Sequence, residues 1–333
     1  MKRGFFANHP VKLRVFGNLN CMHRSFFAVR RRIVYSAERV PLKFLTNPGR
    51  RIQKHPKDGP IMRLSIIIPA YNEEQRLPST LAQLESFFCG RAAAAKVALA
   101  EVIVVDDGSR DGTSEVSRSW NGRLPVRGIR LEQNQGKGAA ARTGMLAASG
   151  DCCLLYDADA ATPPAEIAML IRTMQQRQAD IVIGSRVLGA RENLVSMQWH
   201  RRLIGRIYKT VCTALVPGIE DMACGAKLFT REAARDLFSR QKIDRFAFDI
   251  EVLSLAQRLG YSVVEMPVRW DAVPGSKVNL VFDSLNMLWC VLKLYAGHMV
   301  LRNLGGPAHI RVGHNVDAEV SPEISIGRSS RAA

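Results

Sequence analysis

The sequence predicts an α/β fold, with a mostly parallel sheet covered by helices on both faces. Short, continuous runs of β-branched and aliphatic residues recur along the chain, and such runs are typical of strands buried on both sides. Segments with helical spacing of apolar residues separate these runs. The alternation extends from residue 64 to residue 184, which favours a mostly parallel sheet.

Each element follows from its own pattern. We predict strands at residues 64–69, 101–105, 126–131, 152–156 and 181–184, and helices at residues 81–88, 138–148 and 164–176. The first strand reads Leu-Ser-Ile-Ile-Ile-Pro and the second reads Glu-Val-Ile-Val-Val. Ligands of such sheets bind beyond the carboxyl ends of the strands, so the polar residues after each strand are the first candidates for chemistry.

The composition predicts a globular protein of one or two domains. The chain has 333 residues, of which 47% are hydrophobic and 23% charged, which excludes a disordered or collagen-like protein. The formal net charge of +17 is concentrated in residues 1–60, which hold 14 Lys and Arg against two acids. Because the charge belongs to this segment, it does not predict nucleic acid as a partner. The seven cysteines form no C-x-x-C pair, which favours a reducing compartment without disulfides or structural zinc.

The chain divides into four segments by composition. Residues 1–60 form a basic extension, either disordered or bound at a membrane surface, or they precede a true start at Met62. Residues 61–277 form the folded domain. Residues 278–304 are apolar and aromatic but interrupted by polar residues, which predicts an amphipathic, membrane-associated helix rather than a spanning one. Residues 305–333 show no periodicity, and we expect a disordered tail.

Acidic residues follow three of the predicted strands. Glu73 follows the first strand, Asp107 the second, and Asp157 and Asp159 the fourth. Carboxylates converging at one edge repel each other unless a cation or a donor-rich ligand neutralises them. Asp157 and Asp159 suit Mg²⁺ or Mn²⁺ carrying phosphate oxygens. Asp107 is either a turn residue or the acceptor for the imide N–H of a uracil base.

Residues 134–138 read Asn-Gln-Gly-Lys-Gly and open the helix predicted at 138–148. Glycines at a helix N-terminus leave amide groups free for an anion, and Lys137 adds a positive charge. The spacing is not that of a Walker motif. A G-x-G-x-x-G pattern does not follow the first strand, which argues against a dinucleotide-binding Rossmann domain.

Taken together, these blocks resemble the family 2 inverting glycosyltransferases of the GT-A fold. The resemblance rests on residues 65–74 (SIIIPAYNEE), 104–113 (VVDDGSRDGT), 134–144 (NQGKGAAARTG), 157–159 (DAD) and 183–186 (IGSR). Within that family the later blocks are most similar to the dolichyl-phosphate β-glucosyltransferases; these blocks are residues 221–229 (DMACGAKLF), 248–251 (FDIE) and 270–277 (Trp followed by Gly-Ser-Lys).

The resemblance implies a role for each candidate residue. A uridine pocket would be lined by Pro69, Tyr71, Glu73 and Asp107. The diphosphate and its Mg²⁺ or Mn²⁺ would be held by Lys137, Asp157, Ala158 and Asp159, with Asp157 and Asp159 as the metal ligands. Arg186 and Lys277 would stabilise the leaving group or grip the acceptor phosphate. Asp221 would orient the sugar or the acceptor, or else it is a cap or turn residue.

The implied reaction is transfer of glucose from UDP-glucose to dolichyl or polyprenyl phosphate at the cytoplasmic face of a membrane, by a peripheral or monotopic enzyme. A phosphate acceptor is already an oxyanion near neutral pH, so the site needs no strong base. One alternative is the same fold using GDP-mannose, or a soluble or polysaccharide acceptor. A different class is a catalytically silent nucleotide-sugar sensor or membrane scaffold, which the set of acids and cations disfavours.

Three further features each have two interpretations, and for Cys224 the sequence favours one of them. Asp249 and Glu251 are either a sugar-binding pair or a charged helix face. Cys224 is a packing residue rather than a nucleophile, because its motif contains no histidine. Residues 203–216 have helical spacing behind His200-Arg201-Arg202, which predicts a helix at a membrane surface or one that faces the core.

Overall fold

The computed structural model describes residues 43–46, 62–90, 97–192, 215–271, 273 and 311–313. The helix predicted at 278–304 lies outside these residues, as do residues 203–214 of the helix predicted at 203–216, Lys277, most of the basic extension and most of the tail; the described residues 215 and 216 lie in a turn. Among the described helices, none has the length and apolar character needed to cross a membrane.

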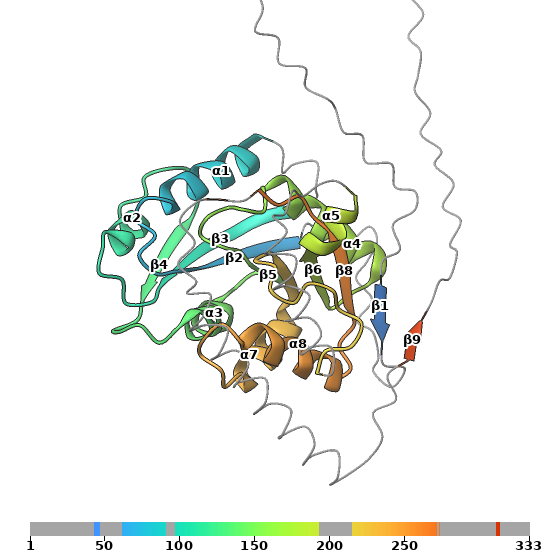
Figure 1. Cartoon of the computed structure of the whole chain (residues 1–333). Helices are drawn as coiled ribbons and strands as arrows, with labels where there is room; N and C mark the ends of the chain where they lie inside the picture. The colour runs from blue at the N-terminus through green and yellow to red at the C-terminus, as the bar shows by residue number, and fades with distance from the viewer. Residues whose placement is uncertain are drawn as a thin grey trace, which may run out of the picture. The chain divides into compact units, whose positions relative to one another are not determined.

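The described strands form one nine-stranded sheet in the order β4-β3-β2-β5-β7-β6-β8-β1-β9 (Figure 1). Their bounds are β1 Lys43–Thr46, β2 Met62–Ala70, β3 Val97–Asp106, β4 Val126–Arg130, β5 Cys152–Leu155, β6 Ile181–Ser185, β7 Lys227–Thr230, β8 Val263–Pro267 and β9 Arg311–Gly313. Within this described sheet, β7 and β1 run against the other strands. The prediction of a mostly parallel sheet is confirmed.

All five predicted strands are present, each within a few residues of its expected bounds. β8, which pairs parallel with β6, was not predicted as a strand, and neither was β7. β7 pairs antiparallel with both β5 and β6, which separates these two parallel strands. The short strands β1 and β9 lie in segments that the sequence reading placed outside the folded domain, and they pair at the β8 edge of the sheet.

Helices cover both faces of the sheet, as predicted (Figure 1). Their bounds are α1 Leu77–Gly90, α2 Thr113–Arg118, α3 Lys137–Ala147, α4 Ala165–Arg177, α5 Arg186–Arg191, α7 Arg231–Arg240 and α8 Phe248–Arg258. Successive side chains of β2 point to opposite faces. Ile67 packs in a cluster with residues of α3, α7 and α8, whereas Ile66 and Ile68 pack in a second cluster with residues of α1 and α4.

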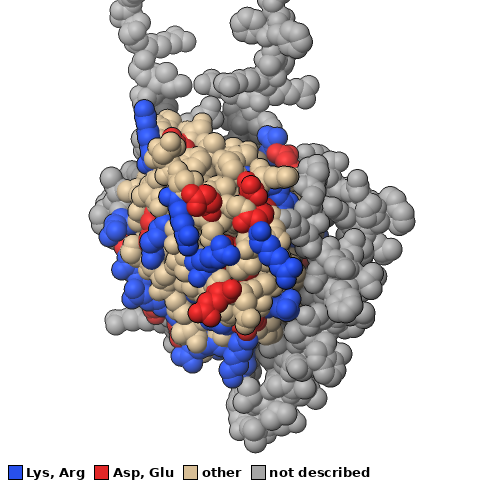
Figure 2. Space-filling view, turned by 90° about the vertical axis from the view of Figure 1, so that its left-hand side faces the viewer, with Lys and Arg blue, Asp and Glu red and all other residues tan. Residues whose placement is uncertain are grey.

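The sheet ends at β4 on the side shown in Figure 2, where basic and acidic side chains are interspersed. Arg127 of β4 pairs with Glu101 at 3.1 Å, and Arg130 lies 3.6 Å from a carboxylate oxygen of Asp106. Charged side chains on an edge strand discourage the pairing of another chain with its free backbone groups.

Candidate active site

The turns after β2 and β3 are tied to each other by hydrogen bonds. The amide of Asn72 donates to Ser109 Oγ at 2.9 Å, and the amide of Glu73 donates to Thr113 Oγ1 at 2.7 Å. Gly108 has a φ of +68°, a conformation that favours glycine, so residues 106–109 form the turn their composition predicts. The turns that carry Tyr71, Glu73 and Asp107 therefore form one rigid unit at the carboxyl edge of the sheet.

Glu73 forms a bidentate ion pair with Arg76. Nε of Arg76 lies 2.6 Å from Oε2 of Glu73, and Nη2 lies 2.5 Å from Oε1. The hydrogen bond to Glu73 raises the pKa of the Arg76 guanidinium, and the nearby carboxylates of Asp159 and Asp157 raise it further. Sequence reasoning missed Arg76, although the spacing of three residues from Glu73 at the start of a helix was a usable signal.

Asp107 binds the loop that opens α3. Its carboxylate accepts hydrogen bonds from Asn134 Nδ2 at 2.9 Å and from the amides of Gln135 and Gly136, both at 2.8 Å. Burial raises the pKa of Asp107 more than these bonds lower it. The expectation that glycine amides of this loop are free for an anion is therefore wrong for Gly136, whose amide, like that of Gln135, is bound to Asp107. Lys137, the next residue, is the part of this loop that reaches the site.

The Asp-Ala-Asp turn after β5 lies beside Lys137. Nζ of Lys137 is 2.6 Å from Oδ1 of Asp157. Burial alone would raise the pKa of Asp157, but the charge of Lys137, with Lys227 and Arg186 beyond it, outweighs burial and lowers the pKa. The pair with Lys137 therefore favours the ionised form of Asp157.

Two further contacts fix this turn. Thr80 Oγ1 of α1 donates to the carbonyl of Ala158 at 2.6 Å, and the amide of Ala161 donates to Oδ1 of Asp159 at 3.0 Å. Asp159 is half-buried and forms no ion pair with any residue that the structure describes. Its carboxylate acts on Arg76 and Lys137 through their charges, without a direct ion pair to either of them.

Gly225 allows the chain to approach Asp157 closely. A Cβ atom at Gly225 would lie 1.9 Å from Oδ2 of Asp157 and 2.2 Å from its Cγ. No side chain fits at position 225 unless the carboxylate moves. The block of residues 221–229, which carried part of the family resemblance, is therefore packed directly against the Asp-Ala-Asp turn.

Arg186 and Asp221, both predicted site residues, bind each other. Nε and Nη2 of Arg186 lie 2.7 and 2.8 Å from the two carboxylate oxygens of Asp221, and the Arg186 amide donates to Oδ2 at 2.9 Å. The guanidinium also lies 5.8 Å from the ring centroid of Trp270, within range of a cation–π contact. Burial would raise the pKa of Asp221, but Arg186 lowers it overall. In this geometry Asp221 fixes the direction of the Arg186 side chain.

Lys227 and Asp249 form a buried ion pair that sequence reasoning did not predict. Nζ of Lys227 lies 2.8 Å from Oδ1 of Asp249 and 2.5 Å from the carbonyl oxygen of Cys224. Glu251 accepts hydrogen bonds from the amides of Lys242 and Ile243, so it shapes a loop. Both acids are buried, which excludes the solvated charged helix face.

The thiol of Cys224 is fully buried, and burial raises its pKa to about 11. A thiol in this state is a poor nucleophile near neutral pH, which agrees with the packing role predicted for it.

The donor atoms of the Asp-Ala-Asp turn fit a hard divalent cation. Asp157 and Asp159 provide carboxylate oxygens, the ligands that Mg²⁺ and Mn²⁺ prefer. Within the described part of the chain, no three His, Cys, Asp or Glu side chains converge into a closed metal site. An ion held here would complete its coordination with water or with oxygens of a bound phosphate, which is the usual arrangement for Mg²⁺.

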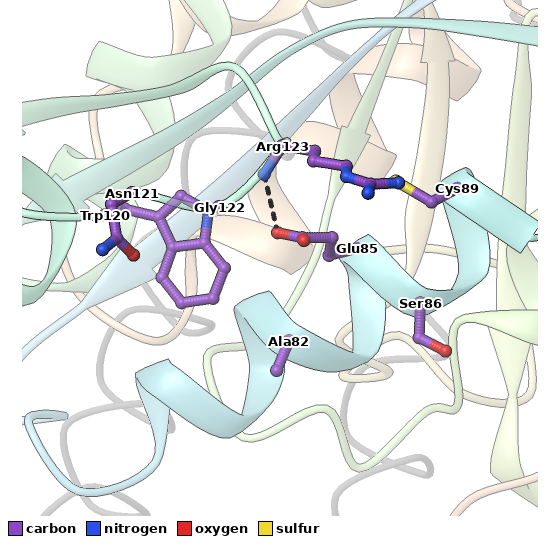
Figure 3. A pocket seen from close by; sticks show the side chains of 8 residues that line it. All are labelled: Ala82, Glu85, Ser86, Cys89, Trp120, Asn121, Gly122 and Arg123. Atoms are coloured by element: carbon purple, nitrogen blue, oxygen red, sulfur yellow. Dashed lines mark hydrogen bonds between the residues drawn. The ribbon is translucent and has the colours of Figure 1, made fainter.

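A hollow of about 430 Å³ lies elsewhere, between α1 and the turn before β4 (Figure 3). Glu85 and Cys89 of α1 line one side, and Trp120 and Arg123 lie opposite. The amide of Arg123 donates to Oε2 of Glu85 at 3.0 Å. None of the predicted site residues lines this hollow.

A mostly parallel sheet whose carboxyl edge carries an Asp-Ala-Asp turn bound by Lys137, with the Arg186–Asp221 pair, is the arrangement of a nucleotide-sugar transferase of the GT-A fold. Comparison with known proteins agrees with this class. The family model described as Glycosyl transferase family 2 matches residues 65–238. The chain belongs to this family.

Curated relatives share more than a third of their aligned residues with this chain. A dolichyl-phosphate beta-glucosyltransferase of Dictyostelium discoideum is 36% identical over 249 residues, covering 72% of this chain and 76% of its own. The Drosophila melanogaster protein of the same name is 39% identical, covering 69% and 74%, and the human one is 37% identical, covering 69% and 74%.

Solved structures confirm the fold. Glucosyl-3-phosphoglycerate synthase of Mycobacterium tuberculosis, in complex with phosphoglyceric acid, superposes with a TM-score of 0.53 at 19% identity and covers 69% of this chain and 78% of its own. The same enzyme in complex with Mn²⁺, UDP and glucosyl-3-phosphoglycerate gives a TM-score of 0.51 at 19% identity, covering 69% and 77%.

Proposed function

We propose that this protein transfers glucose from UDP-glucose to dolichyl phosphate or another polyprenyl phosphate, with inversion at the sugar carbon. The sugar and the acceptor are those in the names of the curated relatives. The uridine donor is supported by the synthase of the same fold, which was solved with UDP. The observation that carries the proposal is the Asp-Ala-Asp turn at the carboxyl edge of the sheet, with Lys137 at 2.6 Å from Asp157.

Asp157 and Asp159 are the residues that would hold Mg²⁺ or Mn²⁺. When bound, such an ion offsets the charge that develops on the departing diphosphate. The structures of the related fold with Mn²⁺ or Mg²⁺ and UDP support the use of a divalent ion. Lys137 and Arg186 add fixed positive charge next to the same turn, which favours an anionic leaving group without reorganisation of water.

With this acceptor the reaction does not require a general base. The second pKa of a phosphate monoester lies near about 6, so a lipid phosphate is already a nucleophile at neutral pH. The protein has to position this oxyanion and screen its charge from the donor diphosphate. Asp221, which is fully engaged by Arg186, supports that task by orienting the guanidinium. Lys277 is proposed for the same task from the family motif.

A polyprenyl phosphate acceptor places the enzyme at a membrane surface. We propose a peripheral or monotopic attachment at the cytoplasmic face, where nucleotide sugars are present. The amphipathic segment at residues 278–304, with its Trp and Tyr among aliphatic residues, supports this attachment from the sequence.

A matrix of donors and acceptors tests the proposal. Purified protein is given UDP-glucose or GDP-mannose with polyprenyl phosphate or with a soluble phosphorylated acceptor, and the lipid and aqueous products are separated. We expect glucose in the lipid fraction from UDP-glucose. Transfer from GDP-mannose alone would overturn the donor, and transfer to the soluble acceptor alone would overturn the lipid.

A further inference from the structure

The carboxylate of Glu73 is already occupied by Arg76. Both of its oxygens accept a charge-assisted hydrogen bond, at 2.6 and 2.5 Å, from the same guanidinium. The Glu73 side chain is 10% exposed and that of Arg76 is 20% exposed. Each oxygen keeps a second lone pair, but the bidentate pair fixes the direction of the carboxylate toward Arg76, whereas the role implied by the family resemblance was to accept an N–H from the base.

Arg76 lies on the face of the chain that contacts the Asp-Ala-Asp turn. Thr80 lies one helical turn further along, and its amide donates to the carbonyl of Arg76 at 3.2 Å. The hydroxyl of Thr80 donates to the carbonyl of Ala158 at 2.6 Å. The carboxylates of Asp159 and Asp157 act on the charge of Arg76. The guanidinium is therefore bound by Glu73, and it lies close enough to the two aspartates for their charges to stabilise it.

Arg76 also keeps donors for a ligand. A guanidinium has five N–H groups, and the pair with Glu73 uses one on Nε and one on Nη2. Toward the residues that the structure describes, both protons of Nη1 and one of Nη2 make no hydrogen bond. A planar fork with free donors next to a metal-ligand turn matches the oxygens of a phosphate better than it matches a base.

We propose that Arg76 binds the diphosphate of the donor and that Glu73 is a positioning residue that orients Arg76, rather than a reader of the uracil base. This inference rests on the proposed UDP-sugar donor. It assigns the Glu73–Arg76 pair to the phosphate end of the donor pocket, and it leaves recognition of the base to Tyr71 and the Asp107 turn.

The test measures dissociation constants of uridine, UMP and UDP, with Mg²⁺ present, for the full chain and its variants. We expect Arg76→Gln to weaken UDP binding at least about tenfold, as for loss of a charged hydrogen bond, and to change uridine binding less than about twofold. Arg76→Lys, which keeps the charge, should recover part of the UDP affinity. Arg172→Gln, an exposed arginine on α4, is the matched control and should bind all three ligands like the parent protein.

Glu73→Gln should weaken UDP in the same selective way, and the double variant should bind UDP no worse than Arg76→Gln. Thermal melting identifies any variant that does not fold. If Glu73→Gln does not fold, the UDP and uridine affinities of the two Arg76 variants test the inference. A parallel loss of uridine and UDP in Glu73→Gln, or unchanged UDP binding in Arg76→Gln, would overturn the inference. Failure of the parent protein to bind UDP would instead overturn the proposed donor.

Discussion

Replacing Gly225 with alanine puts a methyl group where the carboxylate of Asp157 now lies. The new Cβ would be 1.9 Å from Oδ2 of Asp157, whereas real Cβ atoms essentially never approach another atom closer than 3.0 Å, so the two must separate by about 1.1 Å. A displacement of that size also disturbs the 2.6 Å contact with Lys137. Misplacing a reacting group by about 1 Å can lower the rate about 10²-fold, and the steric strain costs about 1–3 kcal/mol of folding stability.

The assay compares glucose transfer from UDP-glucose to polyprenyl phosphate by Gly225→Ala and by the parent protein, after urea unfolding has shown that the variant is folded. Gly90→Ala is the control, because a Cβ at this last residue of α1 meets no atom within 4 Å. We expect the control to keep full activity. A folded Gly225→Ala protein with the parent kcat/KM would refute the claim that the Asp157 carboxylate must stay in place.

Three other changes test separate parts of the structure. EDTA should abolish transfer and Mg²⁺ should restore it, because the ion supplies several kcal/mol of charge stabilisation. For the same reason Asp159→Asn should lower kcat by about 10²-fold or more at saturating Mg²⁺. Equal rates with and without EDTA would contradict this expectation. Lys227→Met should lower the free energy of unfolding in urea by about 3–5 kcal/mol, because it leaves Asp249 buried without its partner. The double variant Lys227→Met/Asp249→Leu should regain most of that loss. A Lys227→Met protein as stable as the parent would show that the pair is not coupled. Iodoacetamide at about pH 8 should label the exposed Cys89 of the native protein but not Cys153, because burial raises the pKa of the Cys153 thiol to about 12. Peptide mass spectrometry measures the labelling, and labelling of Cys153 before Cys89 would contradict this expectation.

The sequence located β2 to β6 well because each is a short apolar run, but it missed β8, which pairs parallel with β6. β7 escaped this reading because its position depends on pairing with β5 and β6, and these contacts span long stretches of chain. Its residues Lys227–Thr230 carry no strong local alternation. Local periodicity cannot show that a strand inserts between two others.

The acids of the site were predictable from their positions after strands, but their partners were not. The Asp-Ala-Asp turn and Arg186 followed from the motifs, whereas the bidentate bonds of Arg186 to Asp221 and of Arg76 to Glu73 depend on side-chain geometry. The glycine loop before α3 resembled an anion-binding site, because the sequence does not reveal that Asp107 binds the amides of Gln135 and Gly136. Which donors are already used is a property of the folded chain.

Binding of Mn²⁺ to the protein, followed by electron paramagnetic resonance with and without UDP, tests the central claim most directly. The claim is that Asp157 and Asp159 hold a divalent ion against the donor diphosphate. We expect one tightly bound Mn²⁺ per chain in the presence of UDP, and we expect Asp159→Asn to lose it while remaining folded. Mn²⁺ binding that is independent of UDP and unchanged in Asp159→Asn would contradict the account.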